Sequence, residues 1–270
     1  MSQLDFFMGE QKETNCQAEE IPMTTVWRKI GFSQTTTDID NKRPYAGEGG
    51  IVEIQRSKSV GAPTVWLWRH IFHNFSEPGD CIFDPFAGGP VRGCVATDLG
   101  RRYCGVDIRE EQIIEDREVC PETTYIHADG LTVLRQRSGI DLVASCPPYW
   151  CLERYSRQAE DISNVSYEEF CDYKGRLTAE AVKRARRWVL WDLGDMRYKK
   201  RLLTIPFDVA ASAAKHGAPL DDYAVVNKPG GLAKIVWKKR WREQQYLARE
   251  HSIVLIWRGK AQGRNEDDDV

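Results

Sequence analysis

The sequence predicts an α/β domain with a seven-stranded, mostly parallel sheet, helices on both faces and an antiparallel last strand. Three observations support this fold class. From about residue 63, segments of helical periodicity alternate with short apolar runs, as in a parallel sheet covered on both sides. One run ends in a glycine-rich turn and a later run ends in two prolines, which are features of the ligand-binding edge of such sheets. The last two strands leave no room for a full crossover helix, so we expect the final strand to run antiparallel.

The elements of the first half follow from local patterns. Residues 63–75 carry apolar residues at helical spacing, and Pro63 suits the start of a helix. Short apolar runs bounded by polar or turn residues are typical of buried strands, and the segments between them have helical composition. The expected strands are residues 81–84, 103–108, 124–127 and 141–145, and the expected helices are residues 91–99 and 109–118.

The second half begins with a helix start signal. Ser166 and Glu169 have the spacing of a capping box, which predicts a long helix that reaches about Arg187. A strand over 188–191, a helix over 205–216 and strands over 223–227 and 251–257 complete the pattern.

The domain is expected to lie between less ordered ends. Residues 1–50 are polar and weakly patterned, which predicts a flexible N-terminal extension, and the acidic residues 261–270 predict a disordered tail. Residues 51–260 would form the domain. No apolar run approaches the roughly 20 residues of a membrane helix, and no secretion signal is evident, so we expect a cytoplasmic protein. The eight cysteines lack Cys-x-x-Cys spacing, which favours reduced thiols and argues against a metal site.

The net charge of −2 hides a strong asymmetry. Residues 182–249 contain 16 Lys and Arg against 6 Asp and Glu, whereas the remainder of the chain has a charge of −12. A basic segment of this kind is typical of a surface that binds a polyanion, although each short run taken alone also fits a solvated helix.

The stretch from Asp84 to Gly93, Asp-Pro-Phe-Ala-Gly-Gly-Pro-Val-Arg-Gly, lies between the first strand and its helix. Glycines at 88 and 89 allow backbone amides to approach a ligand closely. Asp107 ends the next strand, where a carboxylate can accept hydrogen bonds from ribose hydroxyls, and Asp129 after the third strand could contact an adenine amino group. The alternatives are a helix cap at Asp107 and a turn residue at Asp129. The sequence contains neither a Gly-x-Gly-x-x-Gly motif nor a P-loop at this position.

A second motif, Cys146-Pro-Pro-Tyr149, ends the strand over 141–145 and is followed by Trp150. Proline lacks an amide donor and cannot continue the strand, so the chain leaves the sheet there. The motif holds aromatic rings at the sheet edge, in an arrangement that suits stacking on a flat unsaturated ring. The alternative is a strand end with two core aromatics.

Together the two motifs resemble those of the S-adenosylmethionine-dependent amino-methyltransferases of DNA. Asp84-Pro-Phe-Ala-Gly-Gly is similar to the family's Asp-Pro-Phe-x-Gly-Ser/Gly cofactor loop, and Cys146-Pro-Pro-Tyr149 to its Asp/Asn/Ser-Pro-Pro-aromatic catalytic motif. The resemblance covers about residues 56–260 and looks closest to methylases of phages and prophages, through Gly89-Pro-Val-Arg-Gly93, residues 149–164 and residues 250–255. It implies a Rossmann-like class I methyltransferase fold and methylation of adenine N6 or cytosine N4.

The resemblance implies a role for each part of the motifs. In the family, the first side chain and a proline carbonyl accept hydrogen bonds from the target amino group, and the aromatic ring stacks on the flipped base. The implied catalytic residues are Cys146, Pro147, Pro148 and Tyr149, and the implied cofactor-binding residues are Asp84, Pro85, Phe86, Ala87, Gly88, Gly89, Asp107, Ile108 and Asp129.

Two residues depart from the family pattern. Cys146 is a weaker acceptor than a carboxylate or an amide, so it removes the usual cue that separates adenine from cytosine. Pro90 replaces a more usual Ser or Thr and removes one backbone donor from the cofactor loop. Cys146 could instead be structural, and ring-carbon methylation of cytosine is disfavoured because that chemistry expects a Pro-Cys order.

Basic residues interleaved with aromatics predict contacts with double-stranded DNA. No segment is large enough for an elaborate recognition domain, so we expect short or relaxed sequence specificity from the basic segment at about 195–250. The alternatives are methylation of an RNA base or a protein amide, and a catalytically weakened DNA-binding relative. We expect a monomer or a homodimer. The predicted DNA-binding residues are Arg154, Arg197, Lys199, Lys200, Arg201, Lys238, Lys239, Arg240 and Arg242.

Overall fold

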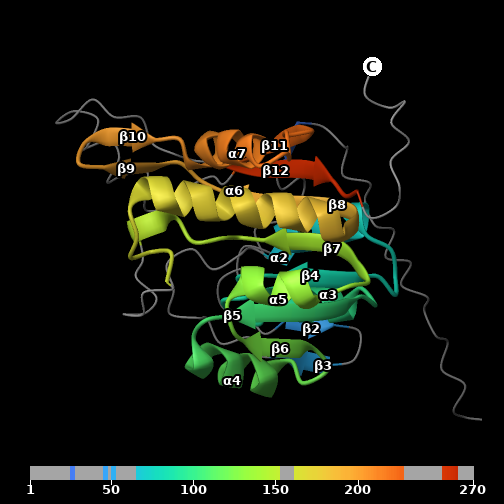
Figure 1. Cartoon of the computed structure of the whole chain (residues 1–270). Coiled ribbons are helices and arrows are strands. Elements are labelled where there is room, and N and C mark those ends of the chain that lie inside the picture. The colour runs from blue at the N-terminus through green and yellow to red at the C-terminus, as the bar shows by residue number, and fades with distance from the viewer. Residues whose placement is uncertain are drawn as a thin grey trace, which may run out of the picture.

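A computed structural model describes residues 25–27, 45–47, 50–52, 65–152, 161–227 and 251–260. The elements that Figure 1 labels follow a regular alternation of strands and helices from α2 to α6. The elements of the first half have the bounds β1 (Val26–Trp27), β2 (Tyr45–Gly47), β3 (Gly50–Val52), α2 (Val65–Phe75), β4 (Cys81–Asp84), α3 (Val91–Asp98), β5 (Arg102–Asp107), α4 (Glu110–Val119), β6 (Thr124–His127), α5 (Gly130–Gln136) and β7 (Ile140–Ser145).

The second half completes the sheet and adds a small hairpin. The bounds are the short 3₁₀ turn η2 (Trp150–Leu152), α6 (Tyr167–Arg184), β8 (Ala185–Leu193), β9 (Met196–Tyr198), β10 (Arg201–Leu203), α7 (Ile205–Lys215), β11 (Asp222–Asn227) and β12 (His251–Arg258). The predicted division into residues 1–50, 51–260 and 261–270 stays a prediction, because residues 261–270 and most of residues 1–50 lie outside the described residues. Residues 45–47 and 50–52 form a two-stranded antiparallel ladder within that region.

The main sheet has the strand order β1-β11-β12-β8-β7-β4-β5-β6. The strands from β8 to β6 pair in parallel, and β12 pairs antiparallel with both of its neighbours, β8 and β11. The predicted seven strands are therefore confirmed, as is the antiparallel direction of the last one. The two-residue strand β1 adds an eighth at one edge, where Trp27 is buried. The strand order reverses between β4 and β7, which is the position where open α/β sheets bind ligands.

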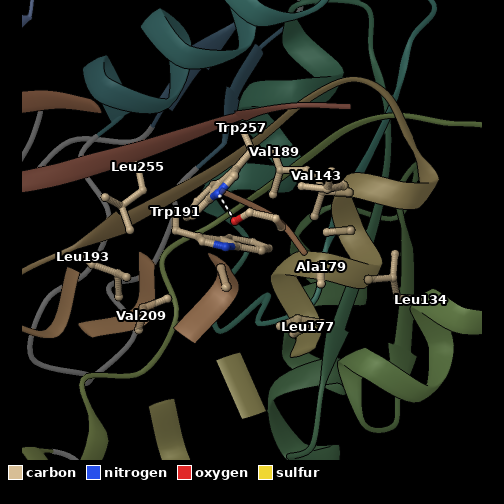
Figure 2. Packing of buried hydrophobic residues seen from close by; sticks show 14 of the residues in the cluster. Leu134, Val143, Leu177, Ala179, Val189, Trp191, Leu193, Val209, Leu255 and Trp257 are labelled. Carbon is tan, nitrogen blue, oxygen red and sulfur yellow. Dashed lines mark hydrogen bonds between the residues drawn. The ribbon is translucent and has the colours of Figure 1, made fainter. Parts of the chain in front are cut away.

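Two hydrophobic clusters cover the two faces of this sheet. One gathers side chains of α5, α6 and α7 on one face, and the other gathers side chains of α2, α3 and α4 on the opposite face. Figure 2 shows part of the first cluster, where Trp191 of β8 and Trp257 of β12 lie with Leu177 of α6 and Val209 of α7. The predicted cover of helices on both faces is confirmed.

Three elements of the structure differ from the prediction. The helix expected to reach Arg187 ends at Arg184, because residues 185–187 already belong to β8, where Ile140 of β7 pairs with Ala185. Helix α5 was not predicted, since it is only seven residues long. The β9–β10 hairpin was not predicted either, because three-residue strands rich in charge carry no periodic signal.

Within the described residues, no helix is long and apolar enough to span a membrane, and no three potential metal ligands gather into a cluster. The seven cysteines in this part of the chain are all free thiols.

Candidate active site at the carboxyl edge of the sheet

The loop that follows β4 is built around the fully buried carboxylate of Asp84. This carboxylate accepts hydrogen bonds from the amide of Phe86 at 3.0 Å, the hydroxyl of Tyr103 at 2.7 Å and the hydroxyl of Ser145 at 2.6 Å. It also forms a buried ion pair with Arg92. Burial alone would lower the pKa of Arg92, but the adjacent Asp84 carboxylate raises it, so the guanidinium stays charged. Asp84 therefore faces the protein and fixes the start of the loop.

Arg92 holds the next part of the loop from the first turn of α3. Its guanidinium donates to the carbonyls of Phe86 at 2.6 Å and Ala87 at 2.7 Å. These two carbonyls are thereby turned toward α3. The amide of Ala87 donates to the carbonyl of Val106 on β5 at 2.8 Å, which ties the loop to the neighbouring strand. The backbone of the loop from Phe86 to Gly88 is consequently held in place by hydrogen bonds to the rest of the protein.

Gly88 gives the loop its turn. Its φ of +65° lies in the left-handed region, which glycine adopts without the steric penalty of a side chain. The Gly88 amide donates to a carboxylate oxygen of Asp107 at 3.0 Å, so the glycine turn and the end of β5 are in direct contact. Pro90 precedes the first residue of α3, and its fixed φ of −72° matches a helix start.

Close packing brings this loop against the start of α5. A Cβ atom on Gly130 would lie 2.4 Å from the carbonyl oxygen of Pro85 and 2.7 Å from its Cβ. A Cβ atom on Gly105 would lie 2.8 Å from the Cβ of Ala87. Only glycine therefore fits at these two positions, and this lets the loop pack closely against α5 and β5.

Asp107 and Asp129 lie at the ends of the adjacent strands β5 and β6, next to the loop. The Asp107 carboxylate also accepts from the amide of Arg109 at 2.8 Å. The Asp129 carboxylate caps α5 by accepting from the amide and the hydroxyl of Thr132, both at 2.7 Å, and it accepts from the hydroxyl of Tyr173. Both acids therefore have local structural contacts, but not the alternatives expected from the sequence: Asp129 is the N-cap of α5 and not a turn residue, and the N-cap position of α4 is Arg109 and not Asp107. A carboxylate has about four acceptor positions, so further hydrogen bonds from a ligand are compatible with these contacts.

The segment Cys146–Tyr149, called here the double-proline corner, follows β7 directly. Ser145 points to Asp84, whereas the half-buried Cys146 places its Sγ 3.7 Å from the hydroxyl oxygen of Tyr149. Pro147 is buried and Pro148 is half-buried. A Cβ on Gly194, just after β8, would lie 3.8 Å from the Tyr149 ring, so the end of β8 borders this tyrosine. The opposite directions of Ser145 and Cys146 agree with the alternation expected along a strand.

The loop that follows β4 (residues 85–89, the glycine loop) and the double-proline corner therefore meet at one edge of the sheet. Strands β4 and β7 are parallel neighbours, and the hydrogen bond from Ser145 to Asp84 joins their carboxyl ends. Ile108 also lies at this edge, where its carbonyl is 3.0 Å from Nε2 of His127.

Of the predicted basic residues, four lie on one element. Arg197, Lys199, Lys200 and Arg201 belong to the β9–β10 hairpin or its tip, which follows β8 at this same edge. Arg154, Lys238, Lys239, Arg240 and Arg242 lie outside the described residues.

Sequence patterns did not single out the side chains that support the two motifs. Tyr103 and Ser145 act on Asp84 across strands, and Tyr173 reaches Asp129 from α6. These contacts join residues far apart in the chain. Arg92 enters the sequence analysis only as part of a segment that resembles the family. The signal for its buried role is that it is an arginine in a helix turn of otherwise small and apolar residues.

Comparison with known proteins supports the same family. A family model described as DNA methylase, of the N6/N4 class, matches residues 8–115. The DNA adenine methyltransferase YhdJ of Escherichia coli is 32% identical over 71 residues, which cover 26% of this chain and 24% of that protein. The type II methyltransferase M.HinfI of Haemophilus influenzae is 36% identical over 66 residues, covering 24% of this chain and 18% of that protein. The chain thus spans a quarter or less of the length of these relatives.

Solved structures show weaker similarity. The human methyltransferase 10 domain containing protein has 12% identity and a TM-score of 0.48, over 83% of this chain and 92% of that one. The TehB-like SAM-dependent methyltransferase of Corynebacterium glutamicum has 12% identity and a TM-score of 0.45, over 70% and 85%. The matches in sequence therefore carry the relationship, and they confirm the resemblance that the two motifs predict: this chain is related to the amino-methyltransferases of DNA.

Proposed function

We propose that the protein is a DNA amino-methyltransferase that transfers a methyl group from S-adenosylmethionine to N6 of adenine or N4 of cytosine. The observation that carries this proposal is the meeting of the glycine loop and the double-proline corner through the Asp84–Ser145 hydrogen bond. This contact joins the two segments, and the pairing of a loop suited to a nucleoside cofactor with a corner suited to a flat base supports the proposed reaction. The family match and the similarity to named DNA methyltransferases support the same reaction.

The residues at the edge fit this cofactor. The turn at Gly88 leaves the loop without a side chain there, and the Asp107 carboxylate is 10% exposed beside it. The backbone of Phe86–Gly89 would hold the amino-acid part of the cofactor, Asp107 and Ile108 the ribose, and Asp129 the adenine. The cofactor supplies a methyl group activated by a sulfonium centre. Both oxygens of the Asp84 carboxylate already bind protein groups, so Asp84 would position the loop and not contact the cofactor.

The double-proline corner would act on the base. The amino nitrogen of adenine or cytosine is a poor nucleophile, since its lone pair is delocalised into the ring. The Pro147 carbonyl and the Cys146 sulfur accept the hydrogen bonds of that amino group, and Tyr149 stacks on the ring. Gly194 leaves room next to the Tyr149 ring. Catalysis then depends mostly on positioning and on electrostatics at the reacting nitrogen.

The decisive experiment measures methyl transfer from labelled S-adenosylmethionine to unmethylated duplex DNA, followed by mass spectrometry of the nucleosides. N6-methyladenine or N4-methylcytosine in the product supports the proposal and identifies the base. Labelled protein or RNA with unlabelled DNA would contradict it. The Tyr149→Ala variant should lose most transfer while it retains binding of S-adenosylhomocysteine, because the ring contacts the base and not the cofactor.

A second candidate is a catalytically weakened DNA-binding relative, which Cys146 favours because a thiol is a weak acceptor. That protein would bind DNA without methyl transfer even at high enzyme concentration. The Cys146→Asp variant separates the two, since a gain of activity from zero indicates a weakened site. For either candidate we propose double-stranded DNA as the partner, the cytoplasm of a bacterial or phage-infected cell as the location, and a monomer or homodimer as the assembly.

A further inference from the structure

The tip of the β9–β10 hairpin has a strained backbone. Tyr198 pairs with Arg201, so Lys199 and Lys200 form a two-residue turn. Their φ values of 47° and 70° are both positive, as in the type I′ turn that suits a hairpin. That turn normally uses Asn-Gly, because an ordinary side chain in the left-handed region lowers the folding equilibrium constant roughly five- to thirtyfold. Two lysines are therefore the wrong residues for the stability of this turn.

Within the described part of the chain, the charges at the tip have no ion-pair partner. Lys199, Lys200 and Arg201 are exposed, and none of them forms an ion pair with any described residue. The Lys199 amine instead lies 5.3 Å from the ring centre of the adjacent Tyr198. Three neighbouring cations on a short ribbon repel one another, so the local charge favours an external anion with several closely spaced charges.

The hairpin is also in contact with the candidate active site. The Tyr198 ring packs edge-on against Trp150, with ring centres 4.9 Å apart, and Trp150 directly follows Tyr149. Trp150 is fixed in turn by its indole hydrogen bond to the carbonyl of Val165 at 2.9 Å and by Tyr167. In Figure 1 the hairpin extends from the same end of the molecule as the start of α6. An anion bound at the tip would thus be held next to the double-proline corner.

We infer that the β9–β10 hairpin holds the phosphate backbone of the substrate duplex, with Lys199 and Lys200 as the contacts, and so sets the position of the duplex relative to Tyr149. This inference rests on the proposed function, because it requires duplex DNA at this edge. The inference has a distinctive consequence: the two lysines favour DNA binding but make the turn less stable. Removing the lysines should weaken DNA binding and strengthen the fold at once.

The test replaces the tip by the favourable turn sequence, as Lys199→Asn with Lys200→Gly, in the full chain. A Lys183→Gln, Lys215→Gln variant is the matched control, since it removes two exposed lysines near the carboxyl ends of α6 and α7. We expect the tip variant to melt at a higher temperature than wild type and to bind duplex DNA on the order of tenfold more weakly. The slope of log Kd against log salt concentration should fall by about two. The control should change none of these three quantities in this way.

A further variant, Lys199→Gln with Lys200→Gln, keeps the backbone strain and removes the charge, so it should lose DNA affinity without the gain in melting temperature. Equal DNA affinity and salt slope for the tip variant and the control would overturn the inference. The proposed function fails separately: wild-type protein that binds DNA through the tip but transfers no methyl group would support the inference and refute the reaction. If the tip variant methylates DNA at the wild-type rate and binds it with the wild-type affinity, the reaction is supported and the inference about the tip is refuted.

Discussion

At the scale of single residues, the most informative side chains are buried ionisable groups outside the two motifs. Asp116 on α4 is fully buried; Gln112 donates to one of its oxygens at 2.8 Å, and the other has no hydrogen-bond partner among the described residues. Burial raises the pKa of Asp116 to about 7. The folded protein therefore keeps a proton that the unfolded chain releases near pH 4, and stability falls as the pH rises from about 4 to 7.

The Asp116→Asn variant should remove this dependence. Asparagine is neutral at every pH and has nearly the same shape, so the variant should be more stable than wild type at pH 8 by a few kcal/mol, on the order of 1.4 kcal/mol for each unit of pKa shift. The gain should vanish near pH 4. Urea unfolding at several pH values measures it, with Glu118→Gln on the exposed side of the same helix as the control. A gain that is the same at all pH values would refute this account.

For Lys174 on α6 we predict the opposite dependence of stability on pH. Its amine is buried between the rings of Phe86 and Phe170, at 5.1 and 4.7 Å from their centres, and has no hydrogen-bond partner in the described part of the chain. Burial lowers the pKa of Lys174 well below its usual 10.5. The unfolded chain then binds a proton that the folded protein does not, so stability falls as the pH drops below 10.5.

We expect Lys174→Met to stabilise the protein by about 1–3 kcal/mol at pH 7, because methionine fills a similar volume without an unsatisfied amine. The difference should shrink as the pH approaches 10.5. Denaturant unfolding at pH 7 and pH 10 measures it. Destabilisation by this substitution at pH 7 would show that the amine has a partner of its own.

At the scale of elements, the glycine loop depends on a close contact with α5. A side chain at Gly130 would overlap Pro85, so Gly130→Ala should shift the loop and lower the affinity for S-adenosylhomocysteine by about tenfold or more, with a loss of about 1–3 kcal/mol in stability. Gly194→Ala is the control, since the nearest atoms to its Cβ are at an ordinary 3.8 Å. Calorimetric titration measures both. Unchanged affinity for the Gly130 variant would show that the loop can move without loss of the ligand.

The elements also show what the sequence could and could not predict. The motifs at Asp84 and Cys146 were recognisable because each ends an apolar strand, and the seven strands follow from local patterns alone. Helix α5 has only seven residues, and its one start signal, Asp129, fits a ligand contact or a turn residue equally well, so local patterns do not predict it. The end of α6 was placed too late because pairing with β7 overrides helical propensity at Ala185. The network around Asp84 joins four segments, and no local pattern contains it.

At the scale of the whole molecule, both faces share one continuous sheet, so the described domain should unfold in one step. Trp68 belongs to the cluster on the α2 and α3 face, and Trp257 to the cluster on the α6 and α7 face. Single Trp68→Phe and Trp257→Phe variants each remove one fluorescence signal. We expect urea transitions by fluorescence and by circular dichroism to coincide in both. Separate midpoints would indicate that the two layers unfold independently.

The position of β12 has a consequence for synthesis on the ribosome. This strand is the last of the sheet in chain order, yet it lies between β8 and β11. Until residues 251–258 have left the exit tunnel, one side of β8 keeps its amides and carbonyls unpaired, and β11 has no route into the sheet. A nascent chain halted before His251 would present an open strand edge of the kind that recruits chaperones or pairs with another copy, so the final strand acts as the closing step of biogenesis.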